Sequence, residues 1–474
     1  MTQWPEGVLP RQVLREFIDA GYIASDVEIP DRNLQPASID LTLGPVAYRL
    51  RSSFLPSSGT VRDKLSDYYM GDLDLTGDGA VLEQDRPYLI PLQERVRLPA
   101  GIRGRTNPRS STGRLDVFTR VITDNGAHFD EIRDGYEGEL FLEVVPMSFT
   151  VKARTGITLN QLRLVSGQAR LSDSELIDLS RTDPIVFPGS SSLPGDRAVV
   201  ADGLFLSVDL SGEGKSFVGY RARRSSALLE LDRVKSYQVA DYWDRIEPKD
   251  GRLILDAGEF YLLVSRERVR VPPDYAAEMA AYDPTSGELR THYAGFFDPG
   301  FGDVEGDTPG TPAVLEVRAH DVPFSLEHGQ RLCKLTFERM SSRPDQLYGA
   351  GLGSRYQRQY LALSRQFRTD QAGVPKRAER NRPQRGHAGA RVADHVDSAA
   401  RGIGDEQLRL VPLDELARLG QLARAAHDGD PARGQRVGDR LEPPSRRVED
   451  DRQFWIAIHR RNRRIPTSIA LSRY

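Results

Sequence analysis

The stretch Ser38-Ile39-Asp40-Leu41-Thr42-Leu43 alternates polar and apolar side chains, and Gly44 follows it. Alternation with a period of two is typical of a β-strand that has one buried face. From Ala37 to about Arg170 the pattern returns in short runs, which Gly, Pro, Asp or Ser interrupt roughly every 8 to 12 residues. Because no long helical pattern separates these runs, the sequence predicts an all-β sandwich or barrel.

The strand pattern begins a second time further along the chain. Ser207-Val208-Asp209-Leu210 matches the first stretch at an offset of 169 (207 − 38), and residues 267–272 match residues 94–99 at an offset of 173 (267 − 94). Leu315-Glu316-Val317 also matches Leu142-Glu143-Val144 at 173 (315 − 142). Three matches at nearly one offset predict a tandem duplication of one domain.

The predicted domain organisation follows from these matches. An N-terminal domain covers residues 1–171, a linker rich in Ser, Asp, Pro and Gly covers 172–203, and a C-terminal domain covers 204–368. Residues 9–23 are predicted to form a short helix that packs outside the first domain, because their apolar side chains recur at helical spacing.

Residues 369–474 have a different composition. Residues 374–404 are rich in Arg, Ala, Gly and Asp and poor in aromatics, so they cannot bury enough apolar surface to offset the loss of chain entropy. Residues 408–427 carry leucines at helical spacing. We expect a low-complexity, largely disordered tail; the alternatives are a basic arm that binds nucleic acid, or a product of a shifted reading frame or a fusion.

Composition excludes several classes of function. The 474 residues are 39% hydrophobic and carry a net charge of −3, so there is no overall basic field for nucleic acid. The single cysteine, Cys333, excludes an intrachain disulfide framework and a Cys-based zinc site. The N-terminal residues do not resemble a signal peptide, and no stretch has the apolar length of a membrane span, so we expect a cytoplasmic protein without membrane contact.

Residues 109–115, Arg-Ser-Ser-Thr-Gly-Arg-Leu, carry a different kind of signal. Two guanidinium groups and two serine hydroxyls suit the oxygens of a polyphosphate. Such a motif in isolation is more often a solvated turn. Phosphate binding by this motif is favoured because further motif segments occur in the same chain. These are residues 35–44 (Gln-Pro-Ala-Ser-Ile-Asp-Leu-Thr-Leu-Gly), 134–138, 141–144, 291–301 and 314–317.

In this order and spacing, the segments resemble the dCTP deaminases of the dUTPase-like superfamily over roughly residues 10–368. The resemblance implies two tandem dUTPase-like β-barrel or jelly-roll domains that convert dCTP and water to dUTP and ammonia, in pyrimidine deoxynucleotide synthesis. The alternatives are a dUTP diphosphatase, a bifunctional deaminase and diphosphatase, or a nucleotide sensor without turnover. A glutamate on the strand after the hairpin favours deamination, and the lack of a clear R-G-x-x-G-F-G-S tail weakens the diphosphatase interpretation.

The two copies keep different parts of the motif set. The first keeps the Arg-Ser-Ser element, whereas the aligned residues 281–288 of the second contain no arginine. The second keeps the hairpin of residues 292–301, whereas the first has a longer hairpin with Arg133 where an Asp is expected. Active sites of the family lie between neighbouring barrels, so we expect the halves to combine into one site, within a chain or between chains. The alternative is that one copy lost its function and serves only for packing.

The resemblance assigns catalysis to a strand glutamate, which falls at Glu316 in the second copy and at Glu143 in the first. We favour Glu316 because its hairpin is intact, and keep Glu143 in reserve. Partial burial against apolar neighbours would raise the carboxyl pKa towards neutrality and allow proton transfer in both directions. The alternative for either residue is a solvated or salt-bridged side chain. The attacking water would be held by Ser110 or Ser111 and by the backbone carbonyl near Ala294.

The remaining site residues are also implied by the resemblance. We expect no zinc, since the H-x-E and P-C-x-x-C patterns of zinc deaminases are absent, and Mg²⁺ bound only through the triphosphate. Residues 348–360 would form a closing lid, or else a flexible connector, and the protein would be a homo-oligomer with sites between barrels. The expected substrate-binding residues are Arg109, Ser110, Arg114, His292, Asp298, Gly300, Tyr348, Arg355 and Gln357.

Overall fold

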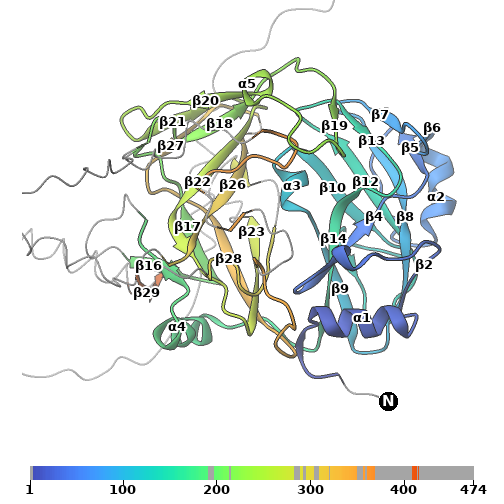
Figure 1. Ribbon diagram of the computed structural model, residues 1–474, viewed down its shortest axis with the longest axis horizontal. Coiled ribbons are helices and arrows are strands. Elements are labelled where there is room, and N and C mark those ends of the chain that lie inside the picture. Colours follow the sequence, from blue (N-terminus) through green and yellow to red (C-terminus); the bar gives the residue numbers. More distant parts are fainter. Residues whose placement is uncertain are drawn as a thin grey trace, which may run out of the picture. The chain divides into compact units, whose positions relative to one another are not determined.

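Strands dominate the computed structural model of this protein. The residues that it describes are 4–189, 197–212, 215–281, 289–291, 295–303, 309–319, 321–349, 356–357, 360–368, 408–413 and 415. These residues form two β-rich halves, which Figure 1 shows in blue to cyan and in green to orange.

Two six-stranded sheets form the N-terminal half. The first has the order β11 (Glu131–Ile132), β9 (Ile102–Pro108), β14 (Thr158–Ser166), β4 (Ser38–Thr42) and β3 (Leu34–Gln35), with β1 (Gly7–Val8) beside β14. The second has the order β10 (Val117–Ile122), β12 (Glu137–Pro146), β8 (Tyr88–Arg97), β5 (Val46–Leu50) and β6 (Tyr69–Asp74), with β2 (Ile23–Ser25) beside β8.

The C-terminal half repeats this arrangement, except that β1 and β29 have no counterparts and that the equivalent order of the second sheet runs in the opposite direction. Its first sheet has the order β25 (Phe296–Phe297), β23 (Tyr275–Ala281), β28 (Arg331–Arg339), β17 (Leu204–Ser207), β16 (Arg197–Val200) and β29 (Arg409–Pro412). Its second has the order β20 (Trp243–Ile246), β18 (Gly219–Ala222), β22 (Phe260–Val269), β26 (Thr311–Ala319) and β24 (Leu289–Thr291), with β15 (Val186–Phe187) beside β22. The β9 and β23 strands begin 173 residues apart (275 − 102), as do β14 and β28 (331 − 158). The predicted all-β fold and its duplication are confirmed.

Two small sheets complete the strand inventory. One pairs β21 (Arg252–Leu255) with β27 (Phe324–Glu327). The other has the order β19 (Leu229–Glu230), β13 (Val151–Ala153) and β7 (Ala80–Leu82). Since β19 belongs to the C-terminal half of the fold and β13 to the N-terminal half, this sheet joins the two halves.

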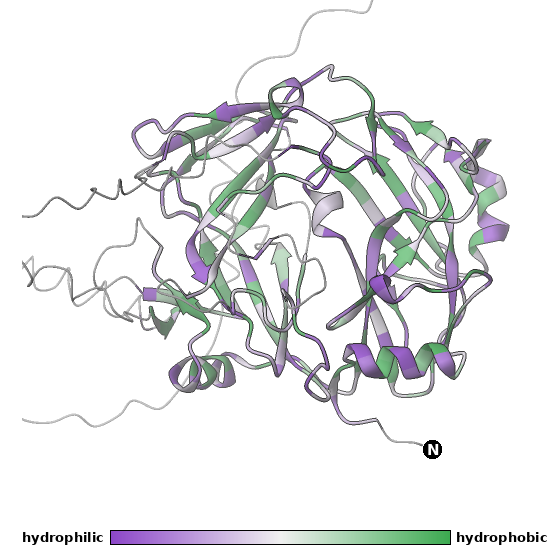
Figure 2. Ribbon diagram, viewed as in Figure 1, coloured by the Kyte–Doolittle hydropathy of each residue, from purple (hydrophilic) through white to green (hydrophobic). Residues whose placement is uncertain are grey.

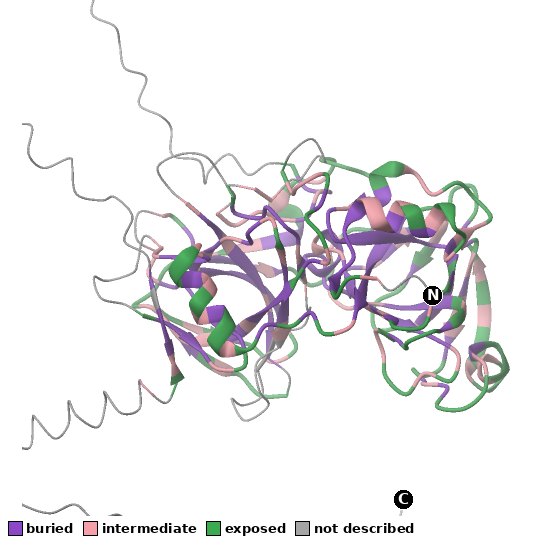
Figure 3. Cartoon of the chain, turned by 90° about the horizontal axis from the view of Figure 1, so that it is seen from below, coloured by how far each residue is buried: buried purple, intermediate pink, exposed green. Residues whose placement is uncertain are grey.

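Each half buries the facing sides of its two sheets in an apolar core. Leu41, Leu142 and Leu162 are fully buried in the N-terminal half, and Leu206 and Leu315 in the C-terminal half. Burying a leucine side chain contributes about 1.5–3 kcal/mol, so these alternating leucines are what selects the strand register. Figure 2 shows the alternation along the strands, and Figure 3 shows the buried sheets inside both halves.

The helices are short. The predicted N-terminal helix is present as α1 (Arg11–Asp19), and it ends earlier than expected because Gly21 adopts a φ of 72°. The amides of Gly21 and Tyr22 donate to the carbonyls of Ile18 and Phe17 at 3.0 and 2.8 Å, which caps the last turn. No helix in the described ranges is long and apolar enough to cross a membrane. The others are η1 (Asp31–Asn33), α2 (Val61–Tyr68), α3 (Ser110–Gly113), α4 (Asp173–Thr182) and α5 (Val239–Tyr242).

The segment 172–203 is not the linker that its composition predicts. It contains α4, β15 and β16, and Ser172 and Glu175 form a reciprocal capping box at the start of α4. Leu176 and Ile185 are buried in the core of the C-terminal half. This segment is therefore part of the second domain.

The described part of the tail also differs from the prediction. Residues 409–412 form the strand β29, which pairs in parallel with β16, and the described residues Leu413 and Glu415 after it are helical. Leu408 and Leu410 are buried against the C-terminal half, so the sheet edge decides their conformation. The prediction of disorder for the rest of the tail lies outside the described residues.

Candidate active site

The Arg-Ser-Ser motif forms one helical turn at the end of a strand. Strand β9 lies between residues 94–99 and this turn: β9 ends at Pro108, and α3 begins at Ser110. Arg109 is its N-cap, and the Arg109 carbonyl accepts from the amides of Thr112 and Gly113 at 2.7 and 3.0 Å. Most of this turn is buried at the boundary between the halves (Figure 1), so it is not a solvated turn.

The facing wall is strand β26 of the C-terminal half, which carries Glu316. The Glu316 carboxyl lies directly against the backbone of α3, since a Cβ added to Gly113 would lie 2.4 Å from Glu316 Oε2. Only a glycine leaves room for the carboxyl at this point. The arginine turn and the strand glutamate, 200 residues apart in the chain, therefore meet.

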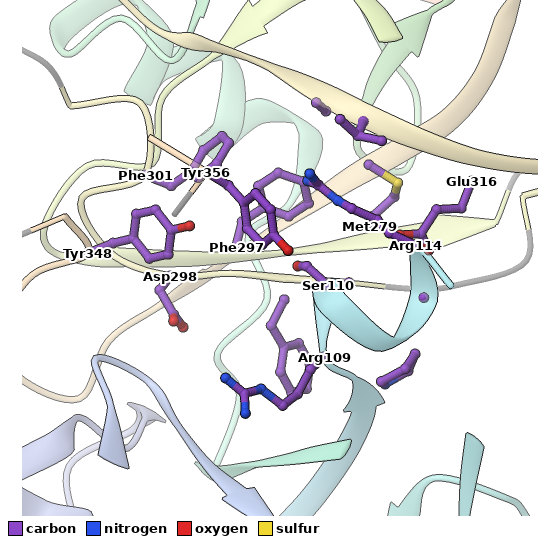
Figure 4. A pocket seen from close by; sticks show the side chains of 16 residues that line it. Arg109, Ser110, Arg114, Met279, Phe297, Asp298, Phe301, Glu316, Tyr348 and Tyr356 are labelled. Carbon is purple, nitrogen blue, oxygen red and sulfur yellow. The ribbon is translucent and has the colours of Figure 1, made fainter. Parts of the chain in front are cut away.

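These elements enclose a cavity whose walls all come from one chain (Figure 4). The predicted combination of halves thus forms within a single chain. Arg109, Ser110 and Arg114 of the N-terminal half lie opposite Asp298 and Glu316 of the C-terminal half. The other residues that line the cavity are Pro108, Gly113, Met279, Gly295, Phe296, Phe297, Phe301, Ala313, Val314, Tyr348 and Tyr356.

The carboxyl of Glu316 has an unusually high pKa. Burial raises the pKa to about 8, the nearby positive charge of Arg114 lowers it in part, and the negative charge of Asp116 raises it further. Part of the side chain is still exposed to the cavity. A carboxyl group with this pKa can accept and return a proton at neutral pH.

Arg114 is held by Tyr356 and by the crossing segment, residues 360–368, which contacts α3. Its Nη1 donates to the carbonyl of Ala362 at 2.6 Å, and its guanidinium lies 3.8 Å from the centre of the Tyr356 ring. In the same crossing segment, Ser364 Oγ donates to the carbonyl of Ser111 at 2.5 Å. Ser111 is thus buried beneath this segment, and of the two serines only Ser110 lines the cavity.

Arg109 turns away from the aromatic side of the cavity (Figure 4). Its Nη1 lies 3.1 Å from Asp40 Oδ2 and donates to Thr158 Oγ1. Asp40 is almost fully buried, and the positive charge of Arg109 opposes the rise that burial causes in its pKa. A bound phosphate would compete with Asp40 for this guanidinium.

The hairpin of the C-terminal half contains Asp298 and Gly300, and it contacts Tyr348. Asp298 is buried, and its pKa is raised to about 6 by burial. Gly300 has a φ of 93°, and an added Cβ would lie 3.1 Å from the Tyr348 amide nitrogen, so the turn requires glycine. The Tyr348 amide donates to the Pro299 carbonyl at 2.8 Å, which holds the Tyr348 ring at the cavity.

Gln357, an expected substrate-binding residue, contacts the hairpin turn instead of the cavity. Its Nε2 donates to the carbonyl of Gly300 at 3.1 Å, and its Oε1 accepts from the amide of Gly302 at 3.0 Å. Its amide therefore braces the hairpin turn, and Gln357 does not line the cavity.

Glu143, the reserve candidate, occupies the equivalent strand position in the N-terminal half. It is fully buried, but it does not line the cavity, and Arg120 Nε donates to its Oε2 at 2.9 Å. The matching hairpin of the N-terminal half has no aspartate at the equivalent position. Ile132 of β11 pairs with Gly104 as Phe297 of β25 pairs with Ala277, so the next residue, Arg133, stands in the place of Asp298. Glu143 is thus a buried, salt-bridged side chain and not part of this cavity.

Three predicted residues, His292, Ala294 and Arg355, lie outside the described residues. Conversely, Met279 falls in no motif, and Val314 falls in the motif segment 314–317 without being selected as a cavity residue. The aromatic residues Phe296, Phe297 and Phe301 fall within the hairpin motif, and Tyr356 within the proposed lid, so their segments but not their contacts could be recognised.

The pKa of Glu316 predicts a gain in stability when the carboxyl is removed. The pKa of Glu316 is about 8 in the folded protein and 4.5 in an unfolded chain, so the folded protein holds this proton more tightly. Between pH 4.5 and pH 8, the free energy of unfolding therefore falls as the pH rises. Glu316→Gln should therefore raise the free energy of unfolding by about 2 kcal/mol at pH 8, after allowance for partial exposure, and have little effect near pH 4. Thermal unfolding of both proteins at the two pH values measures this; an equal shift at both would contradict it.

Comparison with known proteins agrees with the geometry. Residues 5–168 match the family model of the 2'-deoxycytidine 5'-triphosphate deaminase N-terminal domain, and residues 172–367 match that of its C-terminal domain. The chain is similar to a dCTP deaminase of Natronomonas pharaonis, with 31% identity over 32% of this chain and 74% of the relative. It is also similar to a dUMP-forming dCTP deaminase of Methanothermobacter thermautotrophicus, with 29% identity over 30% of this chain and 68% of the relative.

A solved structure extends the similarity to both halves. The crystal structure of 2'-deoxycytidine 5'-triphosphate deaminase from Agrobacterium tumefaciens superposes with a TM-score of 0.68 and 45% sequence identity. The match covers 74% of this chain and 100% of that protein. Together with the duplicated fold and the shared cavity, these matches show that the chain belongs to the dCTP deaminase family, in a form with two fused homologous domains.

Proposed function

We propose that this protein converts dCTP and water to dUTP and ammonia in the cavity between its two halves. The observation that carries the proposal is Glu316, a carboxyl with a pKa of about 8 that faces arginine and serine side chains of the opposite half. Membership of the dCTP deaminase family supports the choice of substrate.

In the proposed mechanism, Glu316 moves the protons. Its carboxylate takes a proton from a water molecule as the water oxygen bonds to C4 of cytosine, and the protonated carboxyl passes that proton to the ring nitrogen N3. Glu316 then takes the proton of the new C4 hydroxyl and delivers it to the exocyclic nitrogen, the C4–N bond breaks as the C4 carbonyl forms, and ammonia leaves. Each transfer returns Glu316 to a state that can serve the next one, which a pKa near neutrality allows.

The other residues would bind and orient the substrate. Ser110 is the serine that can hold the water, because Ser111 is buried beneath the crossing segment. Arg114 would orient the base end beside Glu316, and Arg109 would exchange Asp40 for a phosphate oxygen. Asp298 would accept a hydrogen bond from the sugar.

Substrate entry requires part of the wall to move. The cavity has a volume of about 60 Å³, whereas ligand pockets typically hold on the order of 300 Å³ or more. Tyr348 and Tyr356, two described residues of the segment 348–360, line the cavity, and displacement of these two side chains would open it. This supports the proposal that residues 348–360 act as a lid.

Magnesium is proposed to enter with the nucleotide. The cavity wall presents two arginines, and each of its two carboxyls lies near a cation, Asp298 near Arg163 and Glu316 near Arg114, so the donor set suits a phosphate better than a metal ion. Among the described residues, no group of three or more His, Cys, Asp or Glu is placed to hold a metal. Bound to the triphosphate, Mg²⁺ would neutralise part of its charge.

Product analysis tests the proposed function. Purified protein incubated with dCTP and Mg²⁺ should release dUTP and ammonia in equal amounts, as chromatography and an ammonia assay would show. Direct formation of dUMP would indicate the bifunctional activity that some relatives' names describe, and cleavage of added dUTP alone would indicate a diphosphatase. Binding of dCTP without any product would favour the sensor.

The proposal does not depend on a second chain. The family resemblance still leads us to expect a homo-oligomer in the cytoplasm, but both walls of the cavity come from one chain.

A further inference from the structure

Arg163 is the largest fully buried side chain of the described residues. It lies on β14 of the N-terminal half, and it is 0% exposed. A buried guanidinium is costly unless opposite charges and hydrogen-bond acceptors surround it, so its surroundings indicate what it stabilises.

Those surroundings belong to the opposite half. Arg163 Nη1 donates to the Ala277 carbonyl of β23 at 3.2 Å and lies 3.2 Å from Glu338 Oε2 of β28. Its guanidinium carbon lies 4.0 Å from the centre of the Phe296 ring on β25. One side chain thus contacts three neighbouring strands, including the short edge strand that carries the cavity hairpin.

The fourth contact is with Asp298, the residue that follows β25. Arg163 Nη2 lies 3.6 Å from Asp298 Oδ1, which is an ionic contact but too long for a hydrogen bond. Among the described residues, neither atom has a hydrogen-bond partner. Asp298 lines the cavity and Arg163 does not, so the carboxylate retains acceptor capacity on the substrate side.

The pair exists on only one side of the duplicated fold. The strand equivalence of β14 and β28 puts Thr336 in the place of Arg163 (336 − 163 = 173), and Arg133 stands in the place of Asp298. Arg133 is exposed. The buried cation is therefore present only where the cavity is.

We propose that Arg163 is a positioning residue for substrate binding: it holds the hairpin strand β25 and the Asp298 carboxylate so that this carboxylate accepts a hydrogen bond from the sugar hydroxyl of the substrate. The inference rests on the proposed function for the identity of the substrate. The affinity for dCTP would then depend on Arg163, a residue of the N-terminal half that does not line the cavity.

The charges around Asp298 determine the pH signature of this role. Burial raises its pKa to about 6, the positive charge of Arg163 on β14 opposes that rise, and the negative charge of Asp40 on β4 adds to it. Glu338 on β28 faces Arg163 from the other side, and the Tyr348 hydroxyl lies close enough to be affected by Asp298. Removing the cation should therefore raise the pKa of Asp298 and leave it uncharged at neutral pH.

Three variants test the proposal by steady-state kinetics with dCTP. Arg163→Met should raise KM about tenfold with kcat changed less than threefold, and should move the acid limb of kcat/KM to higher pH. Arg163→Lys, which keeps the charge, should retain the wild-type pH profile. The matched control is Arg105→Met: Arg105 pairs with Glu278 and Glu338 across the same boundary but does not contact Asp298, so KM should not change. In an Asp298→Asn background, Arg163→Met should add little to the rise in KM.

A second measurement is independent of turnover. Hydrogen exchange of the peptide that covers residues 295–303 should be faster in Arg163→Met than in wild type or Arg105→Met. An unchanged KM and exchange rate in folded Arg163→Met, or equal effects of both arginine variants, would overturn the proposal. If wild-type protein does not deaminate dCTP, the proposed function fails, and the exchange experiment still decides whether Arg163 holds the hairpin.

Discussion

Glu316→Gln should lower the rate of dCTP deamination by about 10³-fold or more, because glutamine cannot take a proton from water or return one to the base. The amide has nearly the shape of the carboxyl, so binding of dCTP should change little. The reduction should thus appear in kcat, measured as dUTP formed under saturating dCTP. Retention of more than a tenth of the wild-type rate would exclude Glu316 as the proton carrier.

Glu143→Gln is the matched control for this experiment. Glu143 occupies the equivalent strand position, but it is bound to Arg120 and does not line the cavity. Its substitution should leave kcat and KM within about threefold of wild type and lower the unfolding temperature, since it breaks a buried ion pair. Loss of activity in a folded Glu143→Gln protein would mean that both halves take part in catalysis.

The fold was predictable because its signals are local and repeated. The alternation at residues 38–42 and the offset of 173 residues between equivalent strands require no knowledge of tertiary contacts. The composition of the segment 172–203 favours a linker, whereas its Ser-x-x-Glu capping signal at Ser172 and Glu175 indicates the helix that the structure contains.

The strand β29 shows where local patterns fail. Leu408, Leu410 and Val411 fit either a helix face or an alternating strand, and residues this few do not distinguish the two periods. The free edge of β16 decides between them, because it supplies backbone hydrogen-bond partners that only an extended segment can use. An edge formed by residues more than 200 positions away in the chain leaves no trace in the local sequence.

The candidate site was predictable where a motif exists and not elsewhere. Arg109, Ser110, Arg114, Asp298 and Glu316 were identified from motifs, and they line one cavity. Arg163 gave no such signal, because an arginine among apolar strand residues is expected to face solvent. Both faces of β14 are covered here, one by the core and one by the other half, and only the tertiary structure makes this arginine internal.

The central claim is that each half supplies one wall of a single site inside one chain. Arg114→Ala removes a charge from one wall and Glu316→Ala removes the acid from the other, and each should lower deamination about 10³-fold or more. Both side chains contact the same cavity, so neither defect can be corrected by a second chain if the claim holds.

The decisive measurement is deamination by the two variants after co-expression or after mixing and refolding. A site within one chain predicts no recovery above the sum of the separate activities. A site between chains would instead restore about a quarter of wild-type activity in a randomly mixed dimer, since half of the dimers would carry one intact site of two. Such recovery would contradict the account.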